Sequence, residues 1–483
     1  MAMPGIKKLA AAALAAMTCS AACGAAPKYV FLFIGDGMST PQRMVAESFA
    51  EKIGYGRLAM NSLPYQANTR TQSANSIITD SAAAATAIAC GEKTRNGMVG
   101  VDPSTNRLFS VAEAAKKSGR KVGIVTTVTI CHATPAGFYA HRPSRGMSYE
   151  IGLDMVDSGF DYFCGGGIYS SYDDRKSGEY RGDIRDLARA AGYAVTTNRA
   201  EWEALRPGCR AWSIFGDWGM EFAIDRDESQ PSLAEIVAKG IELLDNPAGF
   251  FIMCEGGKVD YAGHANDAAT NLRDVIALDE AVKTALEFQR LHPEDTLVIT
   301  TGDHETGGLS MGFAGIGGQF RVELLKHQKI SVEKFSEWFK SRVRETKGKI
   351  EFEDIKPVLT EKFGLLFPPP RDDAKAAQKK GPPDPMMLTK KDVKVLEEAF
   401  QTDVDKVRNK VRDTTAHDVA RNYVFAQTVK NVLNAHAGVG WSSGSHTALP
   451  TFTTAAGPRA DIVVGMQENT DLGRRLRALY EEK

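Results

Sequence analysis

The sequence has little cysteine, almost no net charge and, beyond its first residues, no long apolar run. Only 7 of its 483 residues are cysteine, and those after the N-terminal segment form no C-x-x-C pair, which argues against a thiolate metal site and a full disulfide framework. The 59 basic and 60 acidic residues leave a net charge of −1, so no nucleic-acid-binding surface is indicated. No later stretch is apolar over the length of a membrane-spanning helix. Attraction for an anionic ligand must therefore be local, from metal ions or a placed arginine.

The N-terminus, "MAMPGIKKLAAAALAAMTCSAACGAA", has the order of a secretory signal: two lysines, an Ala/Leu stretch and then small residues. We predict a signal peptide over residues 1–26 and export to the periplasm or the cell exterior, with a short buried helix as the alternative. Cys19 and Cys23 stand where a lipoprotein signal places its modified cysteine, although "SAAC" lacks the usual large apolar residue. Membrane attachment is expected only if one of them carries a lipid, and cleavage near Ala26 by an ordinary signal peptidase is the competing prediction.

The remaining composition is that of a globular protein with a sizeable core and many tight loops, because 43% of residues are hydrophobic and 45 are glycine. Cys131 and Cys254 follow apolar runs and are expected to pack as small hydrophobic side chains. Cys164 and Cys209 are candidates for a disulfide in an oxidising compartment, which the sequence leaves open.

Four apolar runs share one design, since each is short, rich in β-forming residues and followed by polar residues. They are "KYVFLFIGDG", "KVGIVTTVTICHATPA", "GFFIMCEGGKVDYAGH" and "DTLVITTGDHETGG". Nearly continuous apolar runs predict strands buried on both faces of a parallel sheet, and helix-like segments such as 109–121 and 271–291 lie between them. This alternation predicts an α/β fold with a doubly wound, mostly parallel central sheet and helices on both faces.

Polar residues fall just past the predicted carboxyl ends of these strands, at the edge where open α/β sheets bind ligands. A turn or a cap explains any one of them, but four strands that deliver such residues to one edge predict a metal site. Mixed nitrogen and oxygen ligands suit zinc, and oxygens suit magnesium. The candidates are Asp36, Thr134, Glu255, Asp260, His264, Asp303, His304 and His446. The spacing of Asp260 and His264 predicts that one helical turn directs both toward one ion, whereas "SGSHTA" predicts a flexible loop around His446.

The segment "SIITDSAAAATAIACG" (76–91) places Ser81 at the start of a strong helix former. In one interpretation Asp80 or Ser81 is simply a good N-cap. In the other, Ser81 is a nucleophile toward phosphate, because helix amides and the helix dipole favour an anion there. Attack on a phosphate monoester needs cations near the entering and departing oxygens, and the metal-type residues elsewhere in the chain therefore favour the second interpretation.

In this order, "GDGM", "TDSAAAATA", "HATPA", "EGGKVDYAGH", "TTGDHETGG" and "GSHTA" resemble the alkaline phosphatase family, over about 28–315 and again over about 436–480. The resemblance implies an alkaline phosphatase that hydrolyses small-molecule phosphomonoesters, releases inorganic phosphate and forms a homodimer. It implies that Ser81 is the catalytic nucleophile, which becomes a phosphoserine, and that Arg145 clamps the phosphate with two hydrogen bonds.

The resemblance also implies two Zn²⁺ ions and one Mg²⁺ ion. One zinc would be held by Asp260, His264 and His446, the second by Asp36, Ser81, Asp303 and His304, and the magnesium by Asp36, Thr134 and Glu255. The position of His132 is aspartate in some family members and histidine in others, and residue type also varies at Tyr261. His132 is therefore expected to ligate the third ion directly or through water, or to bind the phosphate, and the third ion is the least defined cofactor.

Residues 318–436 are rich in Lys, Glu and Asp, and they include the proline-rich stretch "FPPPRDDAKAAQKKGPPDP" (367–385), which predicts an exposed loop. The flanking segments "VEKFSEWFKSRVRE" and "KDVKVLEEAFQTDVDKVRNKVR" predict amphipathic helices. We predict one catalytic domain over 27–483, with 318–436 as a lid-like or crown-like insertion that sets substrate size or dimer contacts. The final apolar segment, "ADIVVGM", is expected to be a strand.

Other activities use a similar sheet and metal edge, namely those of phosphodiesterases, sulfatases and cofactor-independent phosphoglycerate mutases. The nucleophile region lacks the C-x-P-x-R pattern of sulfatases, and the combination of Arg145 and Glu255 favours monoesters. A metal-dependent binding or adhesive surface protein without catalysis is the alternative from another class. The presence of the serine together with every expected ligand argues against it.

Overall fold

The computed structural model describes residues 26–481, apart from 170, 315, 317, 370–383 and 410–423. Nearly all of the predicted signal peptide, both cysteines proposed for lipid attachment and most of the proline-rich loop lie outside the described residues. Within the described part of the chain, no helix combines the length and the apolar character that crossing a bilayer requires.

The core of the molecule is a ten-stranded sheet with the order β14-β2-β13-β8-β1-β7-β3-β4-β6-β5. The four apolar runs form its centre as β1 (Tyr29–Gly35), β3 (Lys121–Thr129), β7 (Phe250–Gly256) and β8 (Thr296–Gly302). Every residue of β1, β7 and β8 is buried, which confirms strands covered on both faces. These strands run parallel, and the register aligns Gly35 with both Gly256 and Gly302. Their carboxyl ends therefore meet at one edge.

The outer strands complete a mostly parallel sheet. They are β2 (Tyr65–Arg70), β4 (Tyr162–Gly166), β5 (Tyr193–Thr196), β6 (Arg210–Ile214), β13 (Thr451–Ala456) and β14 (Gly465–Glu468). Only β13 runs antiparallel to its neighbours. The predicted strand over "ADIVVGM" is confirmed only at its end, where Gly465 and Met466 begin β14. Its first part was wrong, because Ala460–Ile462 form a 3-10 turn with local backbone hydrogen bonds. The edge pairing with β2 begins only at Gly465.

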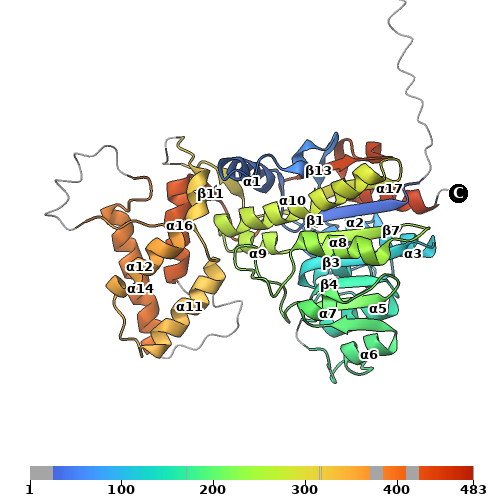
Figure 1. Cartoon of the computed structure of the whole chain (residues 1–483), viewed down its shortest axis with the longest axis horizontal. Helices are drawn as coiled ribbons and strands as arrows, with labels where there is room; N and C mark the ends of the chain where they lie inside the picture. The colour runs from blue at the N-terminus through green and yellow to red at the C-terminus, as the bar shows by residue number, and fades with distance from the viewer. Residues whose placement is uncertain are drawn as a thin grey trace, which may run out of the picture.

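Helices cover both faces of the sheet (Figure 1). Alternate side chains of β1 enter two hydrophobic cores, with Phe31 and Phe33 on one side and Val30 and Leu32 on the other. The first core is covered by α1 (Thr40–Lys52), α7 (Arg199–Glu203), α8 (Leu233–Leu244), α9 (Lys258–His264) and α10 (Ala268–Leu291). The second core is covered by α2 (Ser81–Cys90), α3 (Val111–Lys117), α4 (Ala133–Ala136), α5 (Ser148–Asp157), α6 (Ile184–Ala190) and α17 (Asn469–Glu481). The doubly wound α/β prediction is confirmed.

A separate group of helices lies at the left of Figure 1. It connects β10 (Leu309–Met311) to β11 (Val439–Trp441), two strands that pair with each other. Phe335, Phe339, Phe352, Phe400 and Phe425 pack together in its centre. Its elements are η2 (Val322–His327), α11 (Val332–Glu345), α12 (Phe352–Phe363), α14 (Lys390–Arg408) and α16 (Val424–Ala437).

The cysteines among the described residues are free. Cys131 and Cys254 are buried in the cores, as expected for small hydrophobic side chains. Cys164 is buried in β4 while Cys209 is partly exposed before β6, and no disulfide joins them.

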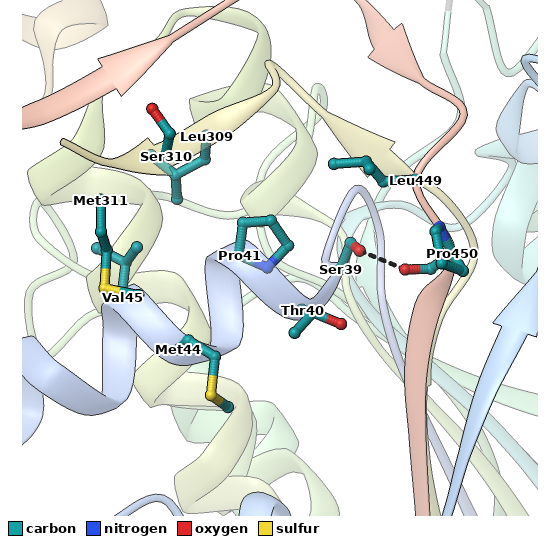
Figure 2. A pocket seen from close by; sticks show the side chains of 10 residues that line it. All are labelled: Ser39, Thr40, Pro41, Met44, Val45, Leu309, Ser310, Met311, Leu449 and Pro450. Carbon is teal, nitrogen blue, oxygen red and sulfur yellow. Dashed lines mark hydrogen bonds between the residues drawn. The ribbon is translucent and has the colours of Figure 1, made fainter. Parts of the chain in front are cut away.

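An apolar hollow of about 430 Å³ lies between the start of α1, β10 and the residues before β13 (Figure 2). Met44, Val45, Leu309, Met311 and Leu449 line it. None of the residues predicted for the metal site or for phosphate binding lines this hollow, so the predicted chemistry lies elsewhere.

Candidate active site

Ser81 is the first residue of α2 and is almost fully buried. The preceding Asp80 is the N-cap, and its Oδ1 accepts a hydrogen bond from the Ala83 amide at 3.0 Å. Because Asp80 caps the helix, the Ser81 hydroxyl is free of that role. It faces the carboxyl edge of the sheet, where Ser81 Oγ lies 3.1 Å from His304 Nε2. The cap and the candidate nucleophile are therefore adjacent residues.

Asp36, Asp303 and His304 converge because they follow the neighbouring strands β1 and β8. His304 Nε2 lies 3.3 Å from Asp36 Oδ1 and 3.2 Å from Asp303 Oδ2. The turn between β1 and α1 contains Gly37 at φ +71°, where a Cβ would lie 2.7 Å from Thr306 Oγ1. Glycine is required there because both the left-handed backbone and the close contact exclude a side chain.

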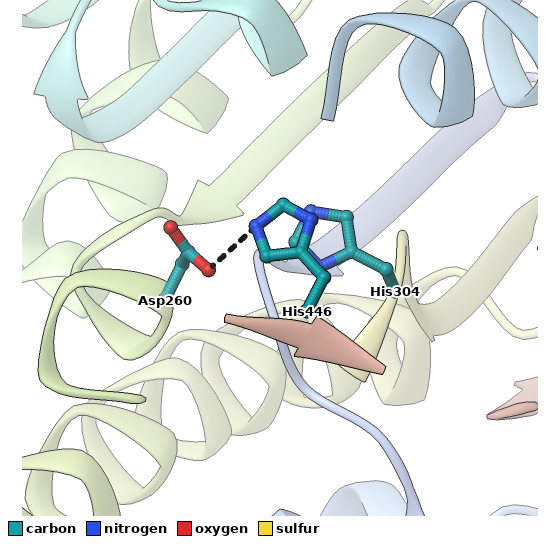
Figure 3. A group of neighbouring side chains, drawn as sticks. All are labelled: Asp260, His304 and His446. Carbon is teal, nitrogen blue, oxygen red and sulfur yellow. Dashed lines mark ion pairs between the residues drawn. The ribbon is translucent and has the colours of Figure 1, made fainter. Parts of the chain in front are cut away.

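Asp260, His264 and His446 form the next group. As predicted, Asp260 and His264 lie one turn apart on α9, with 3.4 Å between Asp260 Oδ2 and His264 Nε2. His446 Nε2 lies 3.2 Å from His264 Nε2 and 3.6 Å from Asp260 Oδ1. The predicted loop around His446 is present, but His446 itself lies in the short strand β12 (His446–Thr447), which pairs with β9 (Glu305–Thr306). Its ring stacks on that of His304 at 3.6 Å between centroids (Figure 3).

The third group contains His132, Asp36 and Glu255. His132 Nδ1 lies 3.7 Å from Asp36 Oδ2 and 3.8 Å from Glu255 Oε1. The other ring nitrogen, Nε2, is 3.0 Å from Arg145 Nη2, while Arg145 Nη1 is 3.2 Å from Asp80 Oδ2. Arg145 is thereby held beside the start of α2 and beside His132.

Unpartnered buried atoms test whether these residues suit metal ions. The following atoms are buried without a hydrogen-bond partner: Asp36 Oδ1 and Oδ2, His132 Nδ1, Thr134 Oγ1, Glu255 Oε1 and Asp303 Oδ2. Such atoms destabilise a fold unless a ligand satisfies them. Ligand atoms lie within 4.8 Å of one another in three sets, which are Asp260–His304–His446, Asp36–Asp303–His304 and Asp36–His132–Glu255. The donor sets therefore fit divalent cations, although the first set contains His304 where the sequence predicted His264.

The pKa values of the site residues are also shifted as expected for a group that binds divalent cations. Burial, reinforced by the charges of Asp303 and Asp260, raises the pKa of Asp36 well above its usual value. Burial likewise raises the pKa of Asp303 to about 8 and lowers the pKa of His304 well below its usual value. Burial alone would also raise the pKa of Asp260, but His264, His446 and His304 outweigh it and lower that pKa to about 2. The buried site thus opposes ionisation of Asp36 and Asp303, and a divalent cation bound there stabilises ionised carboxylates together with neutral imidazoles.

Several supporting residues were missed by the sequence analysis. Thr306 Oγ1 donates to Asp260 Oδ1 at 2.5 Å, and Thr126 Oγ1 donates to Glu255 Oε2. Glu305 is fully buried and accepts hydrogen bonds from Gln42 on α1 and from Thr447 on β12. Glu305 and Thr306 belong to the "DHETGG" segment directly after His304, so that motif was the available signal.

The fold and the site define a class of proteins in which an open α/β sheet presents a serine, carboxylates and histidines at its carboxyl edge. The family described as "Alkaline phosphatase" matches residues 27–481, and the chain belongs to this family.

Alkaline phosphatase 4 of Bacillus subtilis is 30% identical over 459 residues, which cover 92% of this chain and 86% of that protein. Among solved structures, the Thermus thermophilus alkaline phosphatase has a TM-score of 0.73 at 26% identity and covers 94% of this chain and 91% of its own. The cold-active enzyme from Shewanella sp., with a TM-score of 0.76, 24% identity and coverage of 94% and 100%, shares the fold. The chain is thus a phosphatase, an enzyme that acts on phosphate monoesters.

Proposed function

We propose that the chain hydrolyses phosphate monoesters through a covalent phosphoserine on Ser81. The observation that carries this proposal is the position of the Ser81 hydroxyl. It lies at the N-terminus of α2, in contact with His304, while Arg145 is bound to the adjacent Asp80. A phosphate there meets helix amides, the helix dipole and a guanidinium, all of which favour an anion.

The reaction then has two displacement steps. In the first, Ser81 Oγ loses its proton and attacks phosphorus, and the ester oxygen leaves as an alcohol after taking up a proton. In the second, water attacks the phosphoserine, which releases inorganic phosphate and restores the Ser81 hydroxyl. Arg145 and the α2 amides bind the phosphoryl oxygens throughout and stabilise their charge in each transition state.

The proposed ligand sets are those implied by the family resemblance. Two Zn²⁺ ions would be held by Asp260, His264 and His446 and by Asp36, Ser81, Asp303 and His304, and a Mg²⁺ ion by Asp36, Thr134 and Glu255. When bound, such ions lower the pKa of the serine hydroxyl and of water, and they stabilise the leaving oxygen. His132 contacts Arg145 as well as the third ligand set, so we propose that it both orients the phosphate-binding arginine and completes the magnesium site.

The test is Ser81→Ala, assayed with an aryl phosphate after zinc and magnesium are restored. We expect a loss of about 10³-fold or more in kcat, since activated nucleophiles are seldom replaced. Ser76→Ala, in the same segment, is the matched control and should keep wild-type kcat. Acid quenching with ³²P-labelled substrate should trap label on the wild-type serine. Turnover by Ser81→Ala close to that of the wild type would exclude this nucleophile.

Metal dependence has its own test. Dialysis against a chelator is expected to abolish turnover, and metal analysis of the reconstituted protein should find two zinc ions and one magnesium ion per chain. Full activity in metal-free protein would contradict the ligand assignment.

The homodimer, export and lipid attachment stay predictions, and light scattering of the purified protein tests the first of them.

A further inference from the structure

Two large aromatic side chains, Tyr169 and Trp218, are exposed next to each other at the carboxyl edge of the sheet. Tyr169 follows β4 and is 51% exposed, and Trp218 follows β6 and is 63% exposed. Their ring centroids lie 5.0 Å apart at 86°, an edge-to-face pair. The packing of the core does not require either ring, so an exposed aromatic pair of this kind indicates a binding surface.

The loop that carries Tyr169 is joined to the phosphate-binding part of the site. The Tyr169 amide donates to Cys131 Sγ at 3.0 Å, and Cys131 directly precedes His132. The amide of Ile130 donates to Gly166 O and Gly167 O at 3.2 and 3.1 Å. Tyr169 is therefore fixed to the segment whose histidine contacts Arg145.

The loop that carries Trp218 lies over the end of β3, next to the same site. The Met220 amide donates to Thr127 O at 2.9 Å, and a Cβ at Gly219 would lie 3.6 Å from Lys258 Cε. Lys258 Nζ in turn lies 5.0 Å from the centre of the Tyr261 ring, which packs 6.1 Å from that of His132. Trp218 thus borders the site from the side of α9.

The two loops are fixed to each other beneath the aromatic rings. The Gly167 amide donates to Gly216 O at 3.0 Å, and a Cβ at Gly166 would lie 2.6 Å from Gly219 Cα. Gly216 and Gly219 have φ of +92° and +122°, so a side chain is excluded at both by conformation. The pair is therefore a preorganised platform, which binds a ligand with little loss of conformational entropy.

We propose that Tyr169 and Trp218 form a subsite for the planar leaving group of the substrate. Phosphate esters of aromatic alcohols and nucleoside monophosphates would be preferred over aliphatic esters, because flat rings stack on aromatic side chains whatever their substituents. This inference rests on the proposed function, since it places the leaving group beside the phosphate that Ser81 attacks.

The experiment compares kcat/KM of wild type, Trp218→Ala and Tyr169→Ala on an aryl phosphate, a nucleoside 5′-monophosphate and glycerol phosphate. We expect each variant to lose about tenfold on the two planar substrates through a higher KM, in line with measured stacking contributions, and less than twofold on glycerol phosphate. Trp218→Phe should restore most of the loss. Tyr65, an exposed aromatic residue at the start of β2, offers a matched control, and Tyr65→Ala should leave all three values unchanged.

Inhibition by the free nucleoside gives a second readout that does not depend on chemistry at phosphorus. It should be competitive in the wild type and about tenfold weaker in Trp218→Ala. A loss confined to the aryl or to the nucleoside substrate would identify which planar group the subsite takes. Equal losses on all three substrates would show a structural role for the loops, and no loss would show that the pair does not contact the leaving group; both overturn the inference. If Ser81→Ala keeps turnover, the proposed function itself fails, whatever the Trp218 variants do.

Discussion

Glu305→Gln tests how the strand that carries His446 is held in place. The Glu305 carboxylate is fully buried, and four donors face it. Its Oε1 accepts from Gln42 Nε2 at 2.5 Å and from the Leu309 amide at 3.2 Å, and its Oε2 accepts from the Gly308 amide at 3.0 Å and from the Thr447 hydroxyl. Thr447 is the neighbour of His446 on β12. Glu305 thus connects that strand to the rest of the site.

A glutamine at this position must direct its amide N–H groups toward two donors. If the amide replaces Oε2, the Thr447 hydroxyl rotates to accept, but the Gly308 N–H loses its acceptor. If the amide replaces Oε1, the Gln42 amide and the Leu309 N–H both face another donor and lose their acceptor. The orientation with the amide in place of Oε2 is therefore favoured. One lost hydrogen bond to a charged group lowers the free energy of unfolding by about 1.5–3 kcal/mol. A displacement of His446 of the order of 1 Å lowers kcat by about 100-fold.

Urea unfolding of metal-free and metal-loaded protein measures the first effect, and kcat with an aryl phosphate measures the second. Glu51→Gln, at an exposed position on α1, controls for the loss of one negative charge. The reasoning is refuted if Glu305→Gln unfolds within about 0.5 kcal/mol of wild type, the range of ordinary surface substitutions, and also keeps its kcat.

Three further changes test other parts of the structure. Burial raises the pKa of Asp274 from 3.8 to about 7, so the charged form of this side chain destabilises the fold increasingly as pH rises from about 4 to 7. Asp274→Asn should therefore raise the free energy of unfolding by up to about 4 kcal/mol at pH 8 and leave it unchanged below pH 4. Equal urea midpoints of the two proteins at pH 8 would contradict this. Thr306→Val removes the donor to Asp260 and should weaken zinc affinity by about tenfold or more, as measured by chelator competition. Lys430→Met removes the donor to Ala265 O at the end of α9 and should weaken zinc affinity less than Thr306→Val, because it acts on the helix and not on a ligand; unchanged affinity would show that the contact does not position α9.

Much of the fold was predictable because a strand buried on both faces has a nearly continuous apolar sequence. Parallel strands also bring their carboxyl ends to one edge, which is why Asp36, Glu255 and Asp303 were predicted to converge. The helical turn between Asp260 and His264 follows from residue spacing in the same direct way. These features depend on local pattern and on a topology that the pattern itself implies.

The support around the site was not predictable in this way, because it depends on pairings between distant segments. Strands β9 and β12 have two residues each, too few for any alternation to be visible, although their pairing helps to fix where His446 lies. The contact between Thr306 and Asp260 depends equally on the folded arrangement of β9 against α9. Hydrogen-bond partners of metal-type residues leave no periodic signal, so a motif reveals the candidate ligand before it reveals the residue that orients it.

The helical segment between β10 and β11 shows how a long connecting segment is compatible with a closely packed site. Because β10 and β11 pair directly, the ends of the segment lie side by side, and closing even a long loop between adjacent ends adds little entropic cost. The returning chain is fixed at once, since the Ser442 amide donates to Gly307 O at 3.1 Å and the Gly307 amide donates to Ser445 O at 3.0 Å. His446 is thereby placed by contacts that the chain makes after the helical segment has ended.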